Sequence, residues 1–111
     1  MKKNFTSSLR QIIIIQEPII QNDGVGGQLE QWQDFIEVRA DVQALYDRGI
    51  GEVFAAMQLM DNSLYRFRIR FMSELKTNMR IFYNKRYFKI KRIINQDELN
   101  VISVIIAQEY I

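Results

Sequence analysis

The stretch SLYRFRIRF, residues Ser63–Phe71, alternates arginines with large apolar residues. Successive side chains of an extended strand point to opposite faces, so the pattern predicts a β-strand with one buried face and one charged face. Three interpretations of the charged face are open: a grip on nucleic acid, a docking surface for a protein, or the solvated side of a sheet. The charged set, which we call the arginine comb, is Arg66, Arg68 and Arg70, and the apolar set is Tyr65, Phe67, Ile69 and Phe71.

The same period of two recurs upstream of the comb. Apolar residues alternate with polar ones over Ile36–Ala44, a long strand led by Trp32. A first strand is predicted over Arg10–Gln16 and is expected to stop at Pro18. Between these strands, Gln21–Glu30 contains a cluster of glycines that is typical of a flexible loop.

Downstream, the pattern changes once before it returns to strands. Apolar residues at a spacing of three to four predict a short amphipathic helix over Ile50–Met60. A hairpin is then expected, with strands Met79–Tyr83 and Arg86–Ile94 joined across Asn84–Lys85. A turn at Asn95–Leu99 would lead into a last strand, Asn100–Gln108.

These elements predict a mainly β protein. The expected fold is a small antiparallel β-barrel or sandwich of about six strands, with one short α-helix and a long flexible loop. No linker or repeat divides residues 1–111, so we expect one domain, with residues 1–8 as a flexible tail.

Composition narrows the classes of function. The chain of 111 residues contains neither cysteine nor histidine, which excludes disulfides, zinc sites of the Cys/His kind and histidine-based catalysis. The apolar run Ile12–Ile15 is shorter than the ~7–15 residues of a secretory core, and no run approaches the ~18 residues that span a bilayer. We therefore expect a soluble protein of a reducing compartment that is not exported and has no membrane partner.

Charge is distributed unevenly around the formal net charge of +2. Nine acidic and two basic residues lie between positions 11 and 63, whereas ten basic residues and one acidic residue lie between positions 64 and 92. This asymmetry favours a polyanion or an acidic partner. It also fits acidic and basic strands that pair within one sheet, where an opposite-charge pair contributes ~0.2–1 kcal/mol.

No catalytic site follows from these residues. The cluster Asp23–Gly27 lacks the Lys-Ser/Thr of a P-loop and opens no helix, so a flexible connection is favoured over a phosphate cradle. Glu37 and Asp41 share a strand face but lie about 13 Å apart at ~3.3 Å per residue, too far for two carboxylates that act on one atom. We predict no enzyme activity, no cofactor and no metal.

Nucleic-acid binding is the main alternative that the residues leave open. An oligonucleotide-binding β-barrel of the cytosol could use the basic strands between positions 64 and 92, with Arg66–Arg70 and Lys85–Arg92 on the phosphates. Single-strand binding also needs exposed aromatic platforms. The aromatic residues of this region mostly occupy positions that a core would claim, which weakens this reading.

Four segments, taken in order, cover about nine-tenths of the chain: SLRQIIIIQEP, NDGVGGQLEQWQDFIEVRADVQAL, GEVFAAMQLMDNSLYRFRIRF and MRIFYNKRYFKIKRIINQDELNVISVIIAQE. Together they resemble the head–tail adaptor family of tailed bacteriophages and prophages, also described as head–tail joining, stopper or head completion proteins. The resemblance rests on the sum of its motifs. The matching residues are Leu9, Arg10, Gln16, Pro18, Gly24, Gly27, Trp32, Ala40, Gly51–Ala56, Ile69, Arg70, Phe71, Tyr83, Arg86, Phe88, Ile90 and Asp97.

The resemblance implies a structural protein of the virion neck, without catalysis. Such subunits form a homo-oligomeric ring, commonly a dodecamer and in the alternative a hexamer. The ring binds the portal or connector protein above and the tail completion or tail terminator protein below. It lines or gates the channel and makes transient, non-specific contact with double-stranded DNA. Synthesis in the host bacterial cytoplasm is implied as well.

A ring subunit meets its neighbour through two different surfaces, for which complementary charges are useful. A channel lining cannot hold many phosphates tightly without stalling DNA, so we expect the comb to face protein and the lumen to be nearly neutral or acidic. Most contacts are expected from Leu45–Met60 and the loop Gln21–Gln31. The expected interface residues are Glu37, Asp41, Tyr46, Arg48, Glu52, Phe54, Met57, Arg66, Arg68 and Arg70, with a flexible contact loop at Asp23, Gly24, Gly26 and Gly27.

Overall fold

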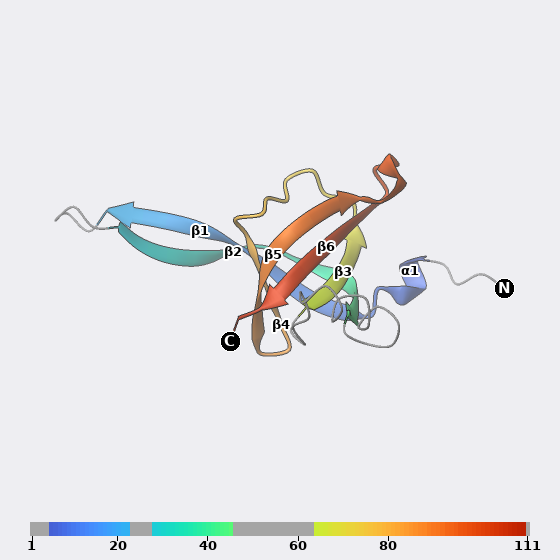
Figure 1. The fold of residues 1–111 in the computed structure, drawn as a ribbon, viewed down its shortest axis with the longest axis horizontal. Coiled ribbons are helices and arrows are strands. Elements are labelled where there is room, and N and C mark those ends of the chain that lie inside the picture. The colour runs from blue at the N-terminus through green and yellow to red at the C-terminus, as the bar shows by residue number, and fades with distance from the viewer. Residues whose placement is uncertain (1–4, 23–27, 46–63, 111) are drawn as a thin grey trace, which may run out of the picture.

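A computed structural model describes residues 5–22, 28–45 and 64–110, and within them six antiparallel strands close into a barrel (Figure 1). Around the wall the strands follow the order β1–β2–β3–β6–β5–β4, and β4 returns to β1. The expected fold class is confirmed. The elements are α1 (Phe5–Ser8), β1 (Gln11–Asn22), β2 (Gln28–Ala44), β3 (Leu64–Arg70), β4 (Arg80–Tyr83), β5 (Arg86–Asn95), the 3₁₀ turn η1 (Gln96–Glu98) and β6 (Ile102–Glu109).

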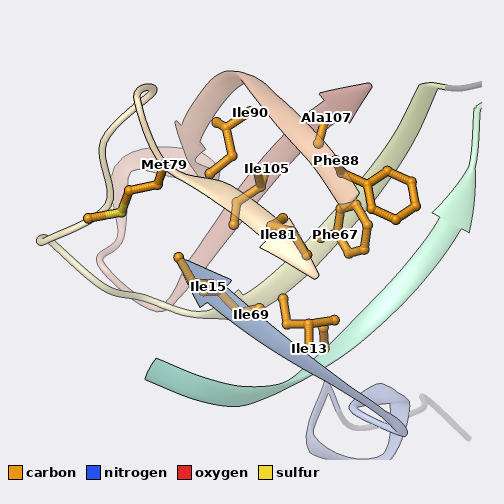
Figure 2. Close-up of a cluster of buried hydrophobic side chains, with 11 residues drawn as sticks. Ile13, Ile15, Phe67, Ile69, Met79, Ile81, Phe88, Ile90, Ile105 and Ala107 are labelled. Atoms are coloured by element: carbon orange, nitrogen blue, oxygen red, sulfur yellow. The ribbon is translucent and has the colours of Figure 1, made fainter. Parts of the chain in front are cut away.

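The barrel is filled by inward side chains from all of these strands (Figure 2). Phe67 and Ile69 of the comb strand are fully buried, as the alternation predicts. The isoleucine run of β1 alternates too, because Ile13 and Ile15 lie in the core whereas Ile12 is 51% exposed. The core cluster consists of Ile13, Ile15, Ala40, Phe67, Ile69, Met79, Ile81, Phe88, Ile90, Ile105 and Ala107.

The prediction that Pro18 stops the first strand is wrong, since β1 continues to Asn22. Proline cannot donate a ladder hydrogen bond and is tolerated where a strand has a free edge. In the described chain, β1 pairs with β4 over Ile14–Gln16, and beyond that point β2 is its one neighbour. Pro18, opposite Trp32 in the register, has no second strand to which it would have to donate.

The expected loop Gln21–Glu30 is too long, because β2 already begins at Gln28. Trp32 therefore lies inside β2 and does not merely lead into it. The pairing of β1 with β2 runs on to Asn22 opposite Gln28, so the two strands form a ribbon that extends beyond the barrel (Figure 1). The glycine-rich composition around these strand ends hid them from sequence reasoning.

Two residues expected on buried strand faces are partly exposed. Ile36 is 37% exposed, because a shift in register against β1 makes Phe35 the extra residue of a bulge, and β3 covers β2 only over Asp41–Ala44. Phe71 is 36% exposed because β3 ends one residue before it. Ile36 and Phe71 are both exposed because they lie where a strand extends beyond the barrel wall or ends.

The helix α1 lies inside the segment that we expected to be a tail, and its contacts with β3 are described below. The helix expected over Ile50–Met60 lies outside the described residues.

The hairpin between β4 and β5 is confirmed. Tyr83 pairs with Arg86, so the loop consists of Asn84 and Lys85 alone. Both loop residues have positive φ, 52° and 62°, as a type I′ turn requires. The expected turn after β5 is confirmed as well, since η1 falls within Asn95–Leu99.

Because Lys85 has a positive φ, a substitution to glycine at this position should increase the stability of the protein. A non-glycine residue in the left-handed region is strained by roughly 1–2 kcal/mol. Glycine relieves this strain but adds about 0.4–1 kcal/mol of unfolded-state entropy, so we expect Lys85→Gly to raise the free energy of unfolding by up to about 1 kcal/mol. Chemical denaturation measures the change. The matched control is Lys89→Gly within β5, where glycine should lower the stability by roughly 0.5–1 kcal/mol. Equal losses in both variants would contradict the turn assignment.

Candidate interaction surfaces

The arginine comb finds its first partner on the neighbouring strand. Asp41 of β2 lies directly opposite Arg68 of β3. The Arg68 guanidinium donates from Nε (2.9 Å) and Nη2 (2.5 Å) to the same oxygen, Oδ2, of Asp41. Both side chains are about three-quarters buried. This charge-assisted pair is the cross-strand contact that the acidic strand and the comb predict together.

Helix α1 covers the outer face of the comb. Arg70 donates from Nη2 to Thr6 Oγ1 at 2.8 Å, and the Arg68 guanidinium lies 5.6 Å from the centre of the Phe5 ring. These contacts tie the chain before β1 to β3. Sequence reasoning missed them because a four-residue helix has no periodicity that could reveal it.

Arg66 is the least satisfied member of the comb. Its Nε is buried and has no hydrogen-bond partner among the described residues. Burial lowers the pKa of Arg66, repulsion from Arg68 lowers it further, and Asp41 partly offsets both. Arg66 and Arg68 are therefore half-buried, and of the comb only Arg70, at the end of β3, is exposed to solvent.

The remaining expected interface residues are placed unevenly. Glu37 is exposed on β2, and its side chain forms no hydrogen bond or ion pair with the other described residues. The structure brings Asp41 and Arg68 together but not Glu37 and Arg66. The other expected interface residues, Tyr46, Arg48, Glu52, Phe54 and Met57, lie outside the described residues, as does the contact loop Asp23, Gly24, Gly26 and Gly27.

The β1–β2 ribbon leaves the barrel as an arm, defined as Gln16–Asn22 paired with Gln28–Asp34. In the described chain, β1 has no second neighbour past Gln16, and β2 meets β3 only from Asp41 onwards. The outer strand edges of the arm therefore carry backbone groups that another chain can pair with. The arm projects along the long axis of a molecule of 59 × 32 × 27 Å (Figure 1).

Amide side chains hold the carboxylates at the base of the arm. Gln33 Nε2 donates to Glu17 Oε1 at 2.6 Å, and Gln16 Nε2 donates to Asp34 Oδ1 at 2.8 Å. Gln16 Oε1 in turn accepts a hydrogen bond of 2.7 Å from Arg80 Nε. Neutral donors orient both carboxylates without cancelling their charge.

Arginine side chains stack on several aromatic rings of the barrel, some on its outer surface and some, such as Tyr65, packed against the core. The Arg80 guanidinium lies 4.3 Å from the centre of the Trp32 ring and 4.1 Å from that of Tyr87. Arg86 lies over Tyr65 at 5.1 Å and donates to its hydroxyl at 2.9 Å, which raises the pKa of Arg86. These rings already stack on cations within the chain, which leaves them poor platforms for nucleic-acid bases.

Apolar side chains gather at two outer sites. A groove of about 350 Å³ beside α1 is lined by residues that include Leu9, Val38 and Phe71. At the corner after η1, Leu99 is 66% exposed and Val101 is 55% exposed. In Figure 1 the arm extends to the left along the long axis, whereas this β5–β6 corner lies at the upper right of the barrel.

Within residues 5–22, 28–45 and 64–110, no cluster of acidic side chains is suited to hold a metal ion. No helix in that part of the chain is long and apolar enough to span a bilayer.

Comparison with known families decides the identity of the chain. Residues 6–109 match the family described as phage head completion protein. The chain belongs to this family. The match begins in α1 and ends in β6, so it includes the arm and the comb. A phage head completion protein is a structural component of the head–tail virion, which confirms the resemblance seen in the sequence.

Two solved structures share the fold of this family member. The solution structure of protein SF1141 from Shigella flexneri 2a superposes with a TM-score of 0.73 at 22% identity and covers 91% of this chain and 92% of that one. A chain in the virion of a native gene transfer agent particle superposes with a TM-score of 0.66 at 19% identity, over 92% and 96%. No curated protein sequence matches the chain.

Proposed function

We propose that this head completion protein is a ring-forming subunit of the phage neck that joins the head to the tail. The ring binds a portal or connector protein on one side and a tail completion or terminator protein on the other. The observation that carries the proposal is the shape of the molecule: a closed barrel from which an acidic arm and a separate apolar corner project in different directions (Figure 1). A connector needs two different surfaces for two different partners.

The contacts that the arginine comb makes within the chain support the same function. Arg68 and Arg70 are engaged by Asp41 and Thr6 of the same chain, so these arginines are not free to grip phosphate. A channel through which DNA moves must avoid many strong phosphate contacts. The proposed ring therefore lines or gates the channel with a nearly neutral or acidic surface and carries no enzyme activity.

Nucleic-acid binding as the main function is not favoured. It requires free aromatic rings beside the basic strands, whereas Trp32 and Tyr87 stack on Arg80 and Tyr65 packs against the core beneath Arg86.

The test of the proposed function is deletion of the gene from the source phage or prophage. We expect filled heads and separate tails in place of joined particles, because the neck lacks the subunit that links them. Negative-stain electron microscopy counts the three species, and the full chain supplied in trans should restore joining. A normal yield of joined particles that contain DNA would contradict the proposal.

A further inference from the structure

We infer that the acidic arm of one subunit docks on the basic outer face of β5 of a second copy of this chain. The basic face is defined as Lys89, Lys91 and Arg92. This inference rests on the proposed ring and names the surfaces by which neighbouring subunits meet.

The arm carries charge of one sign. No lysine or arginine lies between Arg10 and Arg39, whereas this stretch contains five acidic residues. The carboxylates of Glu17 and Asp34 are oriented by glutamine amides, and no recorded ion pair uses them. Within residues 5–22, 28–45 and 64–110, no ion pair compensates this negative charge and no third strand pairs with the outer edges of the arm.

The basic face lies uncompensated on the same molecule. Its three side chains are exposed. The recorded ion pairs of the described chain join Arg68 to Asp41 and Arg86 to Glu109, so they leave this face out. A register shift between Ile90 and Arg92 leaves Lys91 as the extra residue of a bulge, a feature that re-aims side chains at a sheet surface.

At its base the arm lies near one end of the basic face of the same chain, because Trp32 and Lys89 line one cavity, whereas the rest of the arm projects beyond the barrel. In the wall order β1–β2–β3–β6–β5–β4, strand β5 lies across the barrel from β2. The arm leaves the barrel along the long axis and points away from β5 (Figure 1). A contact between the projecting end of the arm and a basic face would therefore join two copies.

Such a contact is heterologous, because each copy offers an arm to one neighbour and a basic face to the other. Heterologous contacts generate a closed ring when the rotation between copies closes. At ~3.3 Å per residue, the stretch from Glu17 to Asn22 extends the arm by about 20 Å, enough to reach across the contact to an adjacent barrel. The charges guide orientation and register, and their contribution should weaken as salt rises.

Cross-linking tests the contact directly, since the chain has no native cysteine. Gln31→Cys places a thiol on the arm, and Ile94→Cys places one on β5 beside the basic face. Equal amounts of the two variants are mixed and treated with a short bis-maleimide, first as purified chains and then in particles formed from the mixture. We expect a cross-linked pair containing one copy of each. The matched control combines Gln31→Cys with Ser73→Cys, an exposed position that lines a cavity with Phe35 and Ile36 of β2.

Charge reversal identifies the forces involved. Glu17→Lys/Asp34→Lys on the arm, or Lys89→Glu/Lys91→Glu/Arg92→Glu on the basic face, should each lower the cross-link yield about ten-fold, as ~1.4 kcal/mol of lost association free energy would. Mixing the reversed arm with the reversed face should restore the yield. If the charge-reversed arm misfolds, Glu17→Gln/Asp34→Asn replaces it in the test. This variant removes the two negative charges without introducing positive ones.

The outcomes separate this inference from the proposed function. If particles require the chain but the arm cross-links to another virion protein and not to a second copy, the inference is overturned and the neck function stands. A yield equal to that of the Ser73→Cys control, or no rescue by the paired reversals, also overturns it. If joined particles form without the chain, the neck function fails, and the purified variants still decide whether copies dock in this way.

Discussion

A Phe67→Ala variant is expected to lose about 3–5 kcal/mol of the free energy of unfolding. Phe67 is fully buried at the centre of the barrel. Its ring centre lies 5.1 Å from that of Phe88 and 6.0 Å from that of Tyr83, both in edge-to-face geometry. Removing the ring deletes these contacts and leaves a cavity that the closed wall cannot collapse to fill (Figure 2).

This loss is large against the ~5–15 kcal/mol by which a domain is normally stable. Urea denaturation followed by tryptophan fluorescence measures it, since the chain contains a single tryptophan. Phe71→Ala is the matched control, because the same side chain is removed at a site that is 36% exposed. We expect that control to lose about 1 kcal/mol or less. Similar losses at both positions would show that Phe67 does not organise the core.

Reversing the charge of Asp41 is expected to have the second largest effect. In Asp41→Lys, Arg68 loses the acceptor of its charge-assisted hydrogen bonds and faces a like charge directly across the strands. Arg66 loses the carboxylate that favours its charged form. We expect a loss of about 1.5–3 kcal/mol, the range for hydrogen bonds to charged groups.

Two further variants separate this pair from general effects of charge. Glu37→Lys makes the same change on the same strand at an exposed residue, and should shift stability by no more than about 0.5 kcal/mol. Asp41→Lys combined with Arg68→Glu restores opposite charges and should recover part of the loss. Denaturation of the wild type, of the single variants Asp41→Lys and Arg68→Glu, and of the double variant gives the coupling free energy. Additive losses would mean that the comb does not depend on its partner strand.

The alternation of residues predicted the parts of the fold that line the core. SLYRFRIRF becomes β3 with Phe67 and Ile69 inside, and the hairpin at Asn84–Lys85 has the turn that its length requires. These predictions succeed because a strand with one buried face must alternate, and a two-residue turn leaves few backbone conformations.

The arm was not predictable in the same way. Pro18 indicated an end and the glycines indicated a loop, yet β1 and β2 continue to Asn22 and from Gln28. A strand with one free edge tolerates proline, and whether an edge is free depends on where β4 stops. The one-sided charge between Arg10 and Arg39 was visible in the sequence, but it acquires meaning only when those residues project together from the barrel.

Some contacts of the candidate surfaces were also predictable from the sequence, and others were not. The partnership of Asp41 with the comb followed from opposite charges on neighbouring strands, whereas the contacts of Arg70 with Thr6 and of Arg80 with Trp32 join residues distant in sequence. Local alternation determines which face of a strand is buried, so the sequence by itself determined a small antiparallel β-barrel or sandwich with an arginine comb on the face away from the core. Only the closed tertiary structure decided which strand edges stay free and which charges stay unpaired, because both depend on where each strand ends against its neighbours.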